Sequence, residues 1–214
     1  MNKKILLIGG GGHCKSVLDS LIQAEQYSEI GIIDKNENIG KHVLGISIVG
    51  CDDDLIKLYR SGYNNAFVTL GSIGDAKHRI KLFSMLEEIG FEIPNIVDST
   101  SIISKDVNMS GGIYVGKNAV VNAGVSIGKG VIINTSSIIE HDCKVESFSH
   151  IATGSVLCGE VHVEENVHIG ANSVVKQQVK IGANTIIGMG SVVLHDIACS
   201  MIAYGNPCKE VKSR

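Results

Sequence analysis

The chain has 214 residues, enough for one large domain or two small ones. Its 25 glycines, its aromatic content of 4% and the absence of tryptophan favour thin, repetitive elements over a single bulky core. A formal net charge of −3, without a cluster of lysine and arginine, argues against a protein that binds nucleic acid through its phosphates.

The amino terminus and the cysteines bear on the cellular compartment. The opening MNKKILLIGGGG holds an apolar run that soon meets glycine, which makes it too short for a membrane span or a signal peptide. The six cysteines form no CxxC pair, which indicates reduced thiols, and their spacing predicts no zinc site. We therefore expect a cytoplasmic protein that contacts no membrane and holds no metal ion.

The first half of the chain alternates apolar runs with segments of helical periodicity. An apolar run over residues 3–9 leads into four consecutive glycines, and the segment that follows has apolar residues at helical spacing. Further strands are expected at 29–33 and 66–70, and further helices at 52–61 and 75–90. This alternation predicts a parallel sheet of Rossmann type. A link over residues 91–98 then separates a first domain, 1–94, from a second, 95–214.

A ligand of such a sheet binds beyond the carboxyl ends of the strands, where the glycine turn, Asp34 and Gly71 would gather. The fingerprint GxGxxG does not fit, because its third glycine would fall on Cys14 or Lys15, so NAD is weakly supported. Backbone amides at a helix N-terminus still attract phosphate, and Asp34 can accept hydrogen bonds from a ribose or a base. The sequence thus predicts a nucleotide without nicotinamide, the alternative being glycines that only form a tight turn.

The second half repeats every six residues from Val97 to Ala198. Cut from Val115, fourteen successive hexads all open on an apolar residue, and their fifth positions hold compact side chains. Two inward side chains per hexad, with polar residues at corners, are typical of a hexapeptide β-solenoid. Three hexads form one triangular coil of eighteen residues, and the register predicts between five and six coils.

His141 interrupts this repeat within INTSSI-IEHDCK, between two acidic residues. Acidic neighbours can fix the tautomer of an imidazole and raise its basicity, as a general base near neutral pH requires. The alternative is a solvated histidine at a solenoid corner. His150 and His168 are eighteen residues apart, so we expect them to stack at the same corner of consecutive coils, with His162 one corner away. Cys143 falls on an inward fifth position and is expected to be a buried thiol.

Stacked histidines on a β-helix raise a rival function, a zinc hydratase of the gamma carbonic anhydrase kind. That family resembles the chain in fold but places two of its ligands five residues apart. No histidine pair in this sequence has that separation.

Three motifs give the chain a resemblance to a known family: GGGGHCKSV near the start, INTSSIIEHDCKVESFSHIATGSVLCG in the repeats and AYGNPCK near the end. From Lys4 to Lys209 the chain resembles the bacterial hexapeptide-repeat sugar acyltransferases that join a Rossmann-like domain to a left-handed parallel β-helix. Within them it is most similar to the UDP-amino-sugar N-acetyltransferases of bacillosamine-type glycan biosynthesis, with the sialic acid O-acetyltransferases close behind.

The resemblance also implies roles for individual residues. His141 would be the general base, Asp142 would increase its basicity, and His150 would contact acetyl-CoA. Gly159, Ala171 and Met189 would line the coenzyme A groove, although relatives carry glycine where this chain has Met189. The UDP-sugar would be held by Gly11, Gly12, His13, Asp34 and Lys35, with Gly71 nearby.

We therefore expect an acetyl-CoA-dependent N-acetyltransferase that acts on a UDP-linked 4-amino-4,6-dideoxy sugar. The resemblance further implies a homotrimer with the acetyl-CoA groove between subunits. The first alternative is an O-acetyltransferase of sialic acid or another sugar. A zinc hydratase and a non-catalytic scaffold are weaker alternatives.

Overall fold

Contacts within the chain divide residues 3–214, the part that the computed structural model describes, into two units. The N-terminal unit extends to Gly71 and resumes over Lys77–Ile96. The solenoid unit comprises Val97–Arg214 together with the short segment Ser72–Ala76.

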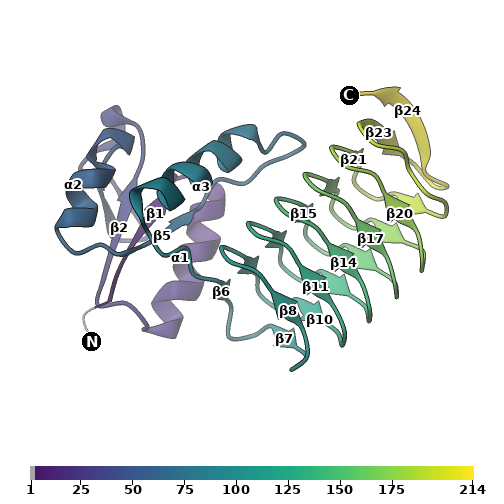
Figure 1. Ribbon diagram of the computed structural model, residues 1–214, viewed down its shortest axis with the longest axis horizontal. Helices are drawn as coiled ribbons and strands as arrows, with labels where there is room; N and C mark the ends of the chain where they lie inside the picture. Colours follow the sequence, from purple (N-terminus) through teal and green to yellow (C-terminus); the bar gives the residue numbers. More distant parts are fainter. Residues whose placement is uncertain (1–2) are drawn as a thin grey trace. The chain divides into compact units, whose positions relative to one another are not determined.

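The N-terminal unit is an α/β layer structure built on a five-stranded sheet with the order β3-β4-β2-β1-β5. Strands β1, β2, β4 and β5 are parallel, and β3 runs antiparallel to β4 at the edge. Figure 1 shows the helices beside these strands. The elements are β1 (Lys4–Ile8), α1 (Gly12–Ala24), β2 (Glu29–Ile33), η1 (Asn36–Asn38), β3 (His42–Val43), β4 (Ile46–Gly50), η2 (Asp52–Asp54), α2 (Leu55–Arg60), β5 (Asn65–Val68) and α3 (Lys77–Ile89).

The glycine turn between β1 and α1 has a local cause. The apolar residues of β1 are buried, and Gly9 follows with a φ of 108°, a backbone conformation that favours glycine. Helix α1 then buries one face through Val17, Leu18 and Leu21. The Rossmann-like unit is confirmed, but β3 and β4 were not predicted, because their short and partly exposed runs carry little alternation.

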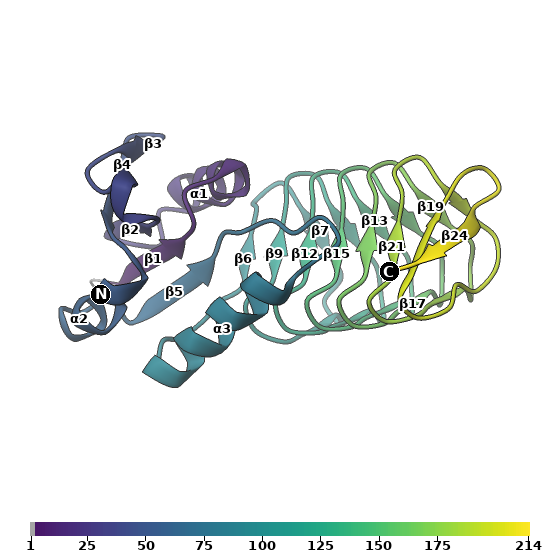
Figure 2. The ribbon, with the colours of Figure 1, turned by 90° about the horizontal axis from the view of Figure 1, so that it is seen from above.

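The solenoid unit is a left-handed parallel β-helix with three sides. Two-residue strands stack coil upon coil, and Figure 2 shows the successive turns from above. Sheet I holds β7 (Ile102–Ile103), β10 (Val120–Val121), β13 (Ile138–Ile139), β16 (Val156–Leu157), β19 (Val174–Val175) and β22 (Val192–Val193). Sheet II holds β8 (Asn108–Met109), β11 (Ser126–Ile127), β14 (Lys144–Val145), β17 (His162–Val163) and β20 (Lys180–Ile181).

Sheet III is the third side and includes the C-terminal hairpin. It holds β6 (Ile96–Val97), β9 (Tyr114–Val115), β12 (Ile132–Ile133), β15 (His150–Ile151), β18 (His168–Ile169), β21 (Ile186–Ile187), β23 (Met201–Tyr204) and β24 (Lys209–Ser213). Strand β24 runs antiparallel to β23 at the end of the stack and gives this open end a cap, which the hexad pattern did not predict.

The core of the solenoid follows the hexad pattern. From β7 to β19, each strand pairs in parallel with the strand eighteen residues later, as Ile133 does with Ile151. The opening residues of the hexads, such as Val145 and Leu157, and the fifth residues, such as Val125 and Val161, are almost completely buried. Two inward side chains per hexad are therefore confirmed.

A helix that crosses a bilayer needs about 20 consecutive, mostly apolar residues, and the helices within residues 3–214 are shorter. None of them combines the length and the apolar character that crossing a membrane demands.

Candidate active site

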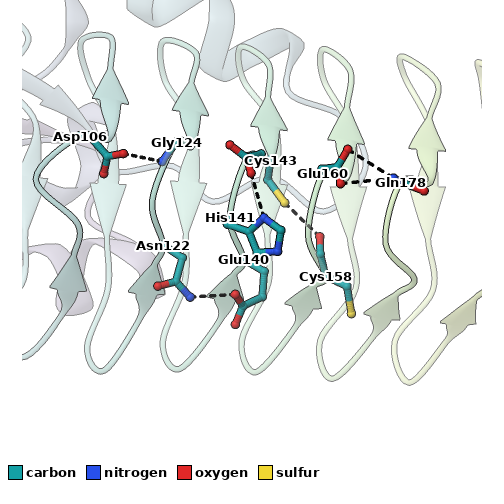
Figure 3. A network of polar contacts seen from close by, with 10 residues as sticks. Asp106, Asn122, Gly124, Glu140, His141, Cys143, Cys158, Glu160 and Gln178 are labelled. Carbon is teal, nitrogen blue, oxygen red and sulfur yellow. Dashed lines mark hydrogen bonds and ion pairs between the residues drawn. The ribbon is translucent and has the colours of Figure 1, made fainter.

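Each coil has three corners, named here by the sheets that they join, and His141 lies at corner I/II between β13 and β14. The next residue, Asp142, has a left-handed backbone with a φ of 59°, which aspartate tolerates better than most residues. The Nδ1 atom of His141 lies 2.9 Å from Oδ2 of Asp142 (Figure 3). A carboxylate accepts, so Nδ1 carries the proton and donates it to this bond, which leaves Nε2 as the basic nitrogen.

Two glycines leave room for this pair. On the coil before, a Cβ atom at Gly124 would clash with the Asp142 carboxylate, and on the coil after, a Cβ atom at Gly159 would lie 2.6 Å from Nε2 of His141. A cavity of about 300 Å³ opens here, lined by His141, Gly159, Glu160, Gln177 and Gln178. The basic nitrogen of His141 therefore lies against the backbone of Gly159 beside open space.

The acidic surroundings of His141 change its protonation. Its hydrogen bond with Asp142 raises the pKa of His141 above the usual value, and the nearby charges of Glu140 and Glu160 add to this effect, against the opposing effect of desolvation. Asn122 holds the carboxylate of Glu140 at 2.9 Å, as Figure 3 shows. The ring is thus a stronger base than an isolated imidazole.

Replacing Asp142 with asparagine tests this effect. His141 must be neutral to accept a proton, so the acidic limb of the pH profile of kcat/KM follows the pKa of His141 in the free enzyme. Because Asp142 raises that pKa, Asp142→Asn is expected to move the acidic limb to lower pH and to reduce the plateau rate less than loss of His141 does. The measurement is kcat/KM across a pH series, and an unchanged limb would contradict the role of Asp142.

His150 lies on another side of the coil, at the start of β15 in sheet III. Its ring is buried, with 8% of its surface exposed. Nδ1 donates to the carbonyl oxygen of Ser72 at 3.0 Å, and Nε2 lies 3.3 Å from the side-chain amide of Asn134. His141 and His150 are nine residues apart in the sequence, which is half of an eighteen-residue coil. Within one chain they therefore lie on different sides of the solenoid and do not meet.

The stack of His150 and His168 is confirmed, though on adjacent strands of sheet III and not at a corner. Their ring centroids are 5.0 Å apart, and burial lowers the pKa of His168. Nδ1 of His168 is buried without a hydrogen-bond partner in the described part of the chain. Within residues 3–214, no group of three or more His, Cys, Asp or Glu side chains has an arrangement that would hold a metal ion.

Ala171 and Met189 occupy corner III/I on successive coils. Their amide N–H groups, like that of Gly159, have no hydrogen-bond acceptor within residues 3–214. Met189 is 81% exposed. Unpaired amides at exposed corners are available to acceptor atoms of a ligand.

The N-terminal unit has a cavity of about 530 Å³ at the carboxyl ends of its parallel strands. Asp34 lines it and accepts hydrogen bonds from the amides of Gly10 (2.5 Å) and Lys35 (2.7 Å) and from Asn38 (3.0 Å). Burial raises the pKa of Asp34, but these bonds outweigh it and hold the pKa below the usual value. The residues that line this cavity are Ile8, Gly9, Ile33, Asp34, Lys35, Asn36, Cys51, Asp52, Asp53, Leu70, His78 and Leu82.

Of the other predicted substrate residues, Gly11, Gly12 and His13 lie at the N-terminus of α1, and Gly71 follows β5. None of these is among those lining residues. Gly11 and Gly12 have open space where a side chain would extend. A Cβ atom at Gly71 would lie 3.6 Å from His13. Burial and the charge of Arg79 lower the pKa of His13 to about 4, so its ring is neutral near pH 7.

Several lining residues were missed in the sequence. Cys51, Asp52 and Asp53 directly follow β4, a strand that was not predicted. His78 lies on α3, which begins after the strand predicted at 66–70. Recognising β4 as a parallel strand would have placed these three at the ligand edge of the sheet. Asn134, the partner of His150, had no signal of its own, because asparagine is common at solenoid corners.

Comparisons with known proteins agree with both units. The model of the PglD N-terminal domain matches residues 4–86, the bacterial transferase hexapeptide model (six repeats) matches residues 160–195, and the hexapeptide repeat of succinyl-transferase matches residues 105–129. A mutant of perosamine N-acetyltransferase from Caulobacter crescentus, solved in complex with CoA and GDP-perosamine, is 33% identical with a TM-score of 0.92, over 98% of this chain and 97% of that one.

Two further structures are similar over nearly the whole length. The acetyltransferase domain of PglB from Neisseria gonorrhoeae, solved with acetyl coenzyme A, is 29% identical with a TM-score of 0.90, over 99% of this chain and 100% of that one. WeeI from Acinetobacter baumannii is 18% identical with a TM-score of 0.67, over 98% and 100%, and supports the fold alone.

Proposed function

The chain belongs to the hexapeptide-repeat sugar N-acetyltransferases with a PglD-type N-terminal domain, and we propose that it transfers the acetyl group of acetyl-CoA to the amine of a nucleotide-linked 4-amino-4,6-dideoxy sugar. The observation that carries this proposal is the geometry of His141. Its Nδ1 is engaged by Asp142, and its Nε2 faces an open cavity beside an unpaired amide. That arrangement suits a base that acts on an incoming nucleophile.

The proposed reaction is direct transfer in one ternary complex. Nε2 of His141 removes a proton from the sugar amine as the nitrogen attacks the thioester carbonyl, so that a C–N bond forms. The amide of Gly159 donates to the oxyanion, the C–S bond then breaks, and the protonated His141 returns its proton to the leaving thiolate. Proximity, proton transfer and oxyanion stabilisation accelerate the reaction, and no covalent acyl-enzyme intermediate is required.

The coenzyme A arm is proposed to bind along corner III/I. The free amides of Ala171 and Met189 are one coil apart, about 4.8 Å, and offer two donors to the amide carbonyls of an extended chain. His150 stays a predicted contact of acetyl-CoA. Its contact with the side-chain amide of Asn134, at 3.3 Å, is longer than its bond to the carbonyl oxygen of Ser72 and is the one that a ligand would replace.

A homotrimer would complete this site. The outward residues of sheet I form an apolar row that is partly or fully exposed: Ile102, Val120, Ile138, Val156, Val174 and Val192. An exposed apolar strip of this kind marks an interface. It is bounded by the corner of His141 on one edge and the corner of Ala171 on the other. In a cyclic assembly packed through sheet I, the first corner of one copy meets the second corner of the next.

Replacing Val156 with lysine tests the trimer, because it puts a charge at the centre of the apolar row. We expect the particle mass from light scattering to fall from three chains to one and acetyl transfer to fall by more than tenfold. Ser126→Lys, on the outward face of sheet II, is the matched control and should leave both unchanged. A monomeric wild-type chain that is fully active would contradict the proposal.

The nucleotide is proposed to bind in the N-terminal unit. Bare amides at the start of α1 suit a diphosphate, and the hydrogen-bonded Asp34 fixes the glycine turn on which those amides lie. Lys35 lines the adjoining cavity and adds a positive charge. UDP remains the predicted nucleotide, and the relative solved with GDP-perosamine makes GDP the necessary comparison.

A thiol-release assay tests the function. Acetyl-CoA is supplied with UDP- and GDP-linked 4-amino sugars, with the same sugars lacking a nucleotide, and with sialic acid. We expect rapid release with one nucleotide-linked amine and a steep loss without the nucleotide, because remote binding energy supports the transition state. Equal acetylation of sialic acid would favour the O-acetyltransferase, and no release with any acceptor would exclude the proposed reaction.

A further inference from the structure

Three buried side chains at fifth hexad positions lie sixteen residues before the three unpaired amides of the proposed site (143 to 159, 155 to 171 and 173 to 189). Each is fully buried. Each donates to the carbonyl oxygen of the peptide unit that contains one of those amides: Cys143 Sγ to Cys158 (3.1 Å), Ser155 Oγ to Gly170 (2.9 Å) and Ser173 Oγ to Gly188 (2.9 Å). Figure 3 shows the first of these bonds beside His141.

The geometry of the peptide unit lets each of these bonds set the direction of the neighbouring N–H group. In a trans peptide the C=O and N–H bonds are coplanar and point in opposite directions. An inward donor that holds the carbonyl oxygen of Cys158 therefore directs the N–H of Gly159 outward. The same applies to Ser155 with Ala171 and to Ser173 with Met189.

We propose that Cys143, Ser155 and Ser173 are positioning residues that hold these peptide planes so that their N–H groups face the substrate. The proposal rests on the function proposed above. It assigns Cys143 to the oxyanion donor Gly159, and it assigns the two serines to the amides that bind the coenzyme A arm.

The solenoid itself does not need donors at these positions. Along the column of Cys143, Val125 and Val161 occupy the same inward place on the neighbouring coils, and both corners fold in the same way. Along the column of Ser155 the inward residues are Ala119, Ser137, Ser173 and Ser191, so alanine occupies this place two coils before Ser155. Other fifth positions also carry donors: the hydroxyl groups of Ser137, Ser149, Thr185 and Ser191 donate to the carbonyl oxygens of Asn134, Glu164, Ala198 and Gly188. The valines and the alanine in the two columns indicate substitutions that the fold accepts.

Cys143 remains a donor under working conditions. Burial raises the pKa of its thiol to about 11, so the proton stays on sulfur near neutral pH. A thiol is a weaker donor than a hydroxyl. Because Cys143 is fully buried, however, its thiol contacts the carbonyl oxygen of Cys158 from the dry interior of the solenoid.

Cys143→Val and Cys143→Ser test the oxyanion assignment. Valine keeps the packing seen in adjacent coils but removes the donor. We therefore expect kcat to fall about tenfold, which corresponds to a partial loss of one oxyanion donor. The KM for acetyl-CoA should stay unchanged. Serine restores a donor and is expected to recover most of the rate. A valine variant with wild-type kcat, or a serine variant as slow as valine, would overturn the assignment.

Ser155→Ala and Ser173→Ala test the groove assignment. We expect Ser155→Ala to raise the KM for acetyl-CoA severalfold while kcat changes less than twofold. Ser173→Ala should give a smaller rise, because Ser191 Oγ also donates to the carbonyl oxygen of Gly188, at 2.6 Å. The matched control is Ser149→Val, because Ser149 makes the same bond to Glu164 (2.7 Å) at corner II/III, and Val131 and Val167 flank it in its column. The control should lower the melting temperature as the other variants do without changing either kinetic constant.

The outcomes separate this proposal from the proposed function. If the wild-type chain transfers acetyl groups but all four hydroxyl or thiol deletions change kcat and KM alike, the side chains are structural and the positioning role is wrong. If the wild-type chain neither transfers acetyl groups nor binds acetyl-CoA in a calorimetric titration, the proposed function is wrong, and the positioning role is excluded with it.

Discussion

His141→Ala is expected to lower kcat by about a hundred- to ten-thousandfold, the usual contribution of general acid–base catalysis, with acetyl-CoA affinity nearly unchanged. The ring sits at an exposed corner, so its removal disturbs no core packing. It acts on the incoming amine and not on the resting contacts of the thioester. The measurements are steady-state kinetics with the preferred acceptor and calorimetric titration of acetyl-CoA.

A second histidine in the same solenoid provides the control. His162 also pairs with a carboxylate, that of Glu146 at 2.6 Å, but on sheet II. His162→Ala should keep the wild-type rate. If His141→Ala keeps it as well, another group is the base.

The solenoid could be predicted from the sequence because its period is local. Each hexad repeats the same choice of inward and outward residues, so a register found at Val115 extends through the stack without knowledge of any distant contact. The same period relates His141 to Gly159, eighteen residues later, and thus predicts that they are neighbours on adjacent coils.

Contacts that lie outside the period could not be predicted. The bond from His150 to Ser72 joins residues 78 positions apart, and nothing in a hexad pattern specifies it. The N-terminal cavity was predicted only in part, since Asp34 follows a strongly apolar strand, whereas Cys51 follows β4, whose residues are partly exposed. Where a strand is short and its partner distant, packing decides the structure and the local sequence does not.

The two corners of the proposed site also lie apart within one chain. His141 and Ala171 lie at different corners of the triangular coil, and only the apolar row between them suggests how copies would bring the corners together. Residue types predict the chemistry of the base, whereas the homotrimer that we propose would bring the two corners together.

Gly159→Ala is expected to lower kcat about a hundredfold, comparable to the effect of a misplacement of about 1 Å at a reacting group. The backbone of Gly159 does not have a positive φ, so alanine is tolerated there without strain. Its Cβ atom would, however, lie 2.6 Å from Nε2 of His141 and force the ring away from the amine. The melting temperature should change little, because His141 is exposed and free to move.

The double variant His141→Ala/Gly159→Ala tests whether the methyl group acts by displacing the ring of His141 or by a direct effect at Gly159. If the methyl group acts only by displacing the ring, it has nothing left to displace once the ring is absent, so the two losses should not multiply and the double variant should be about as slow as His141→Ala. A double variant a further hundredfold slower would mean that the methyl group blocks the oxyanion donor or the substrate, and the contact between Gly159 and His141 would not be the cause of the loss.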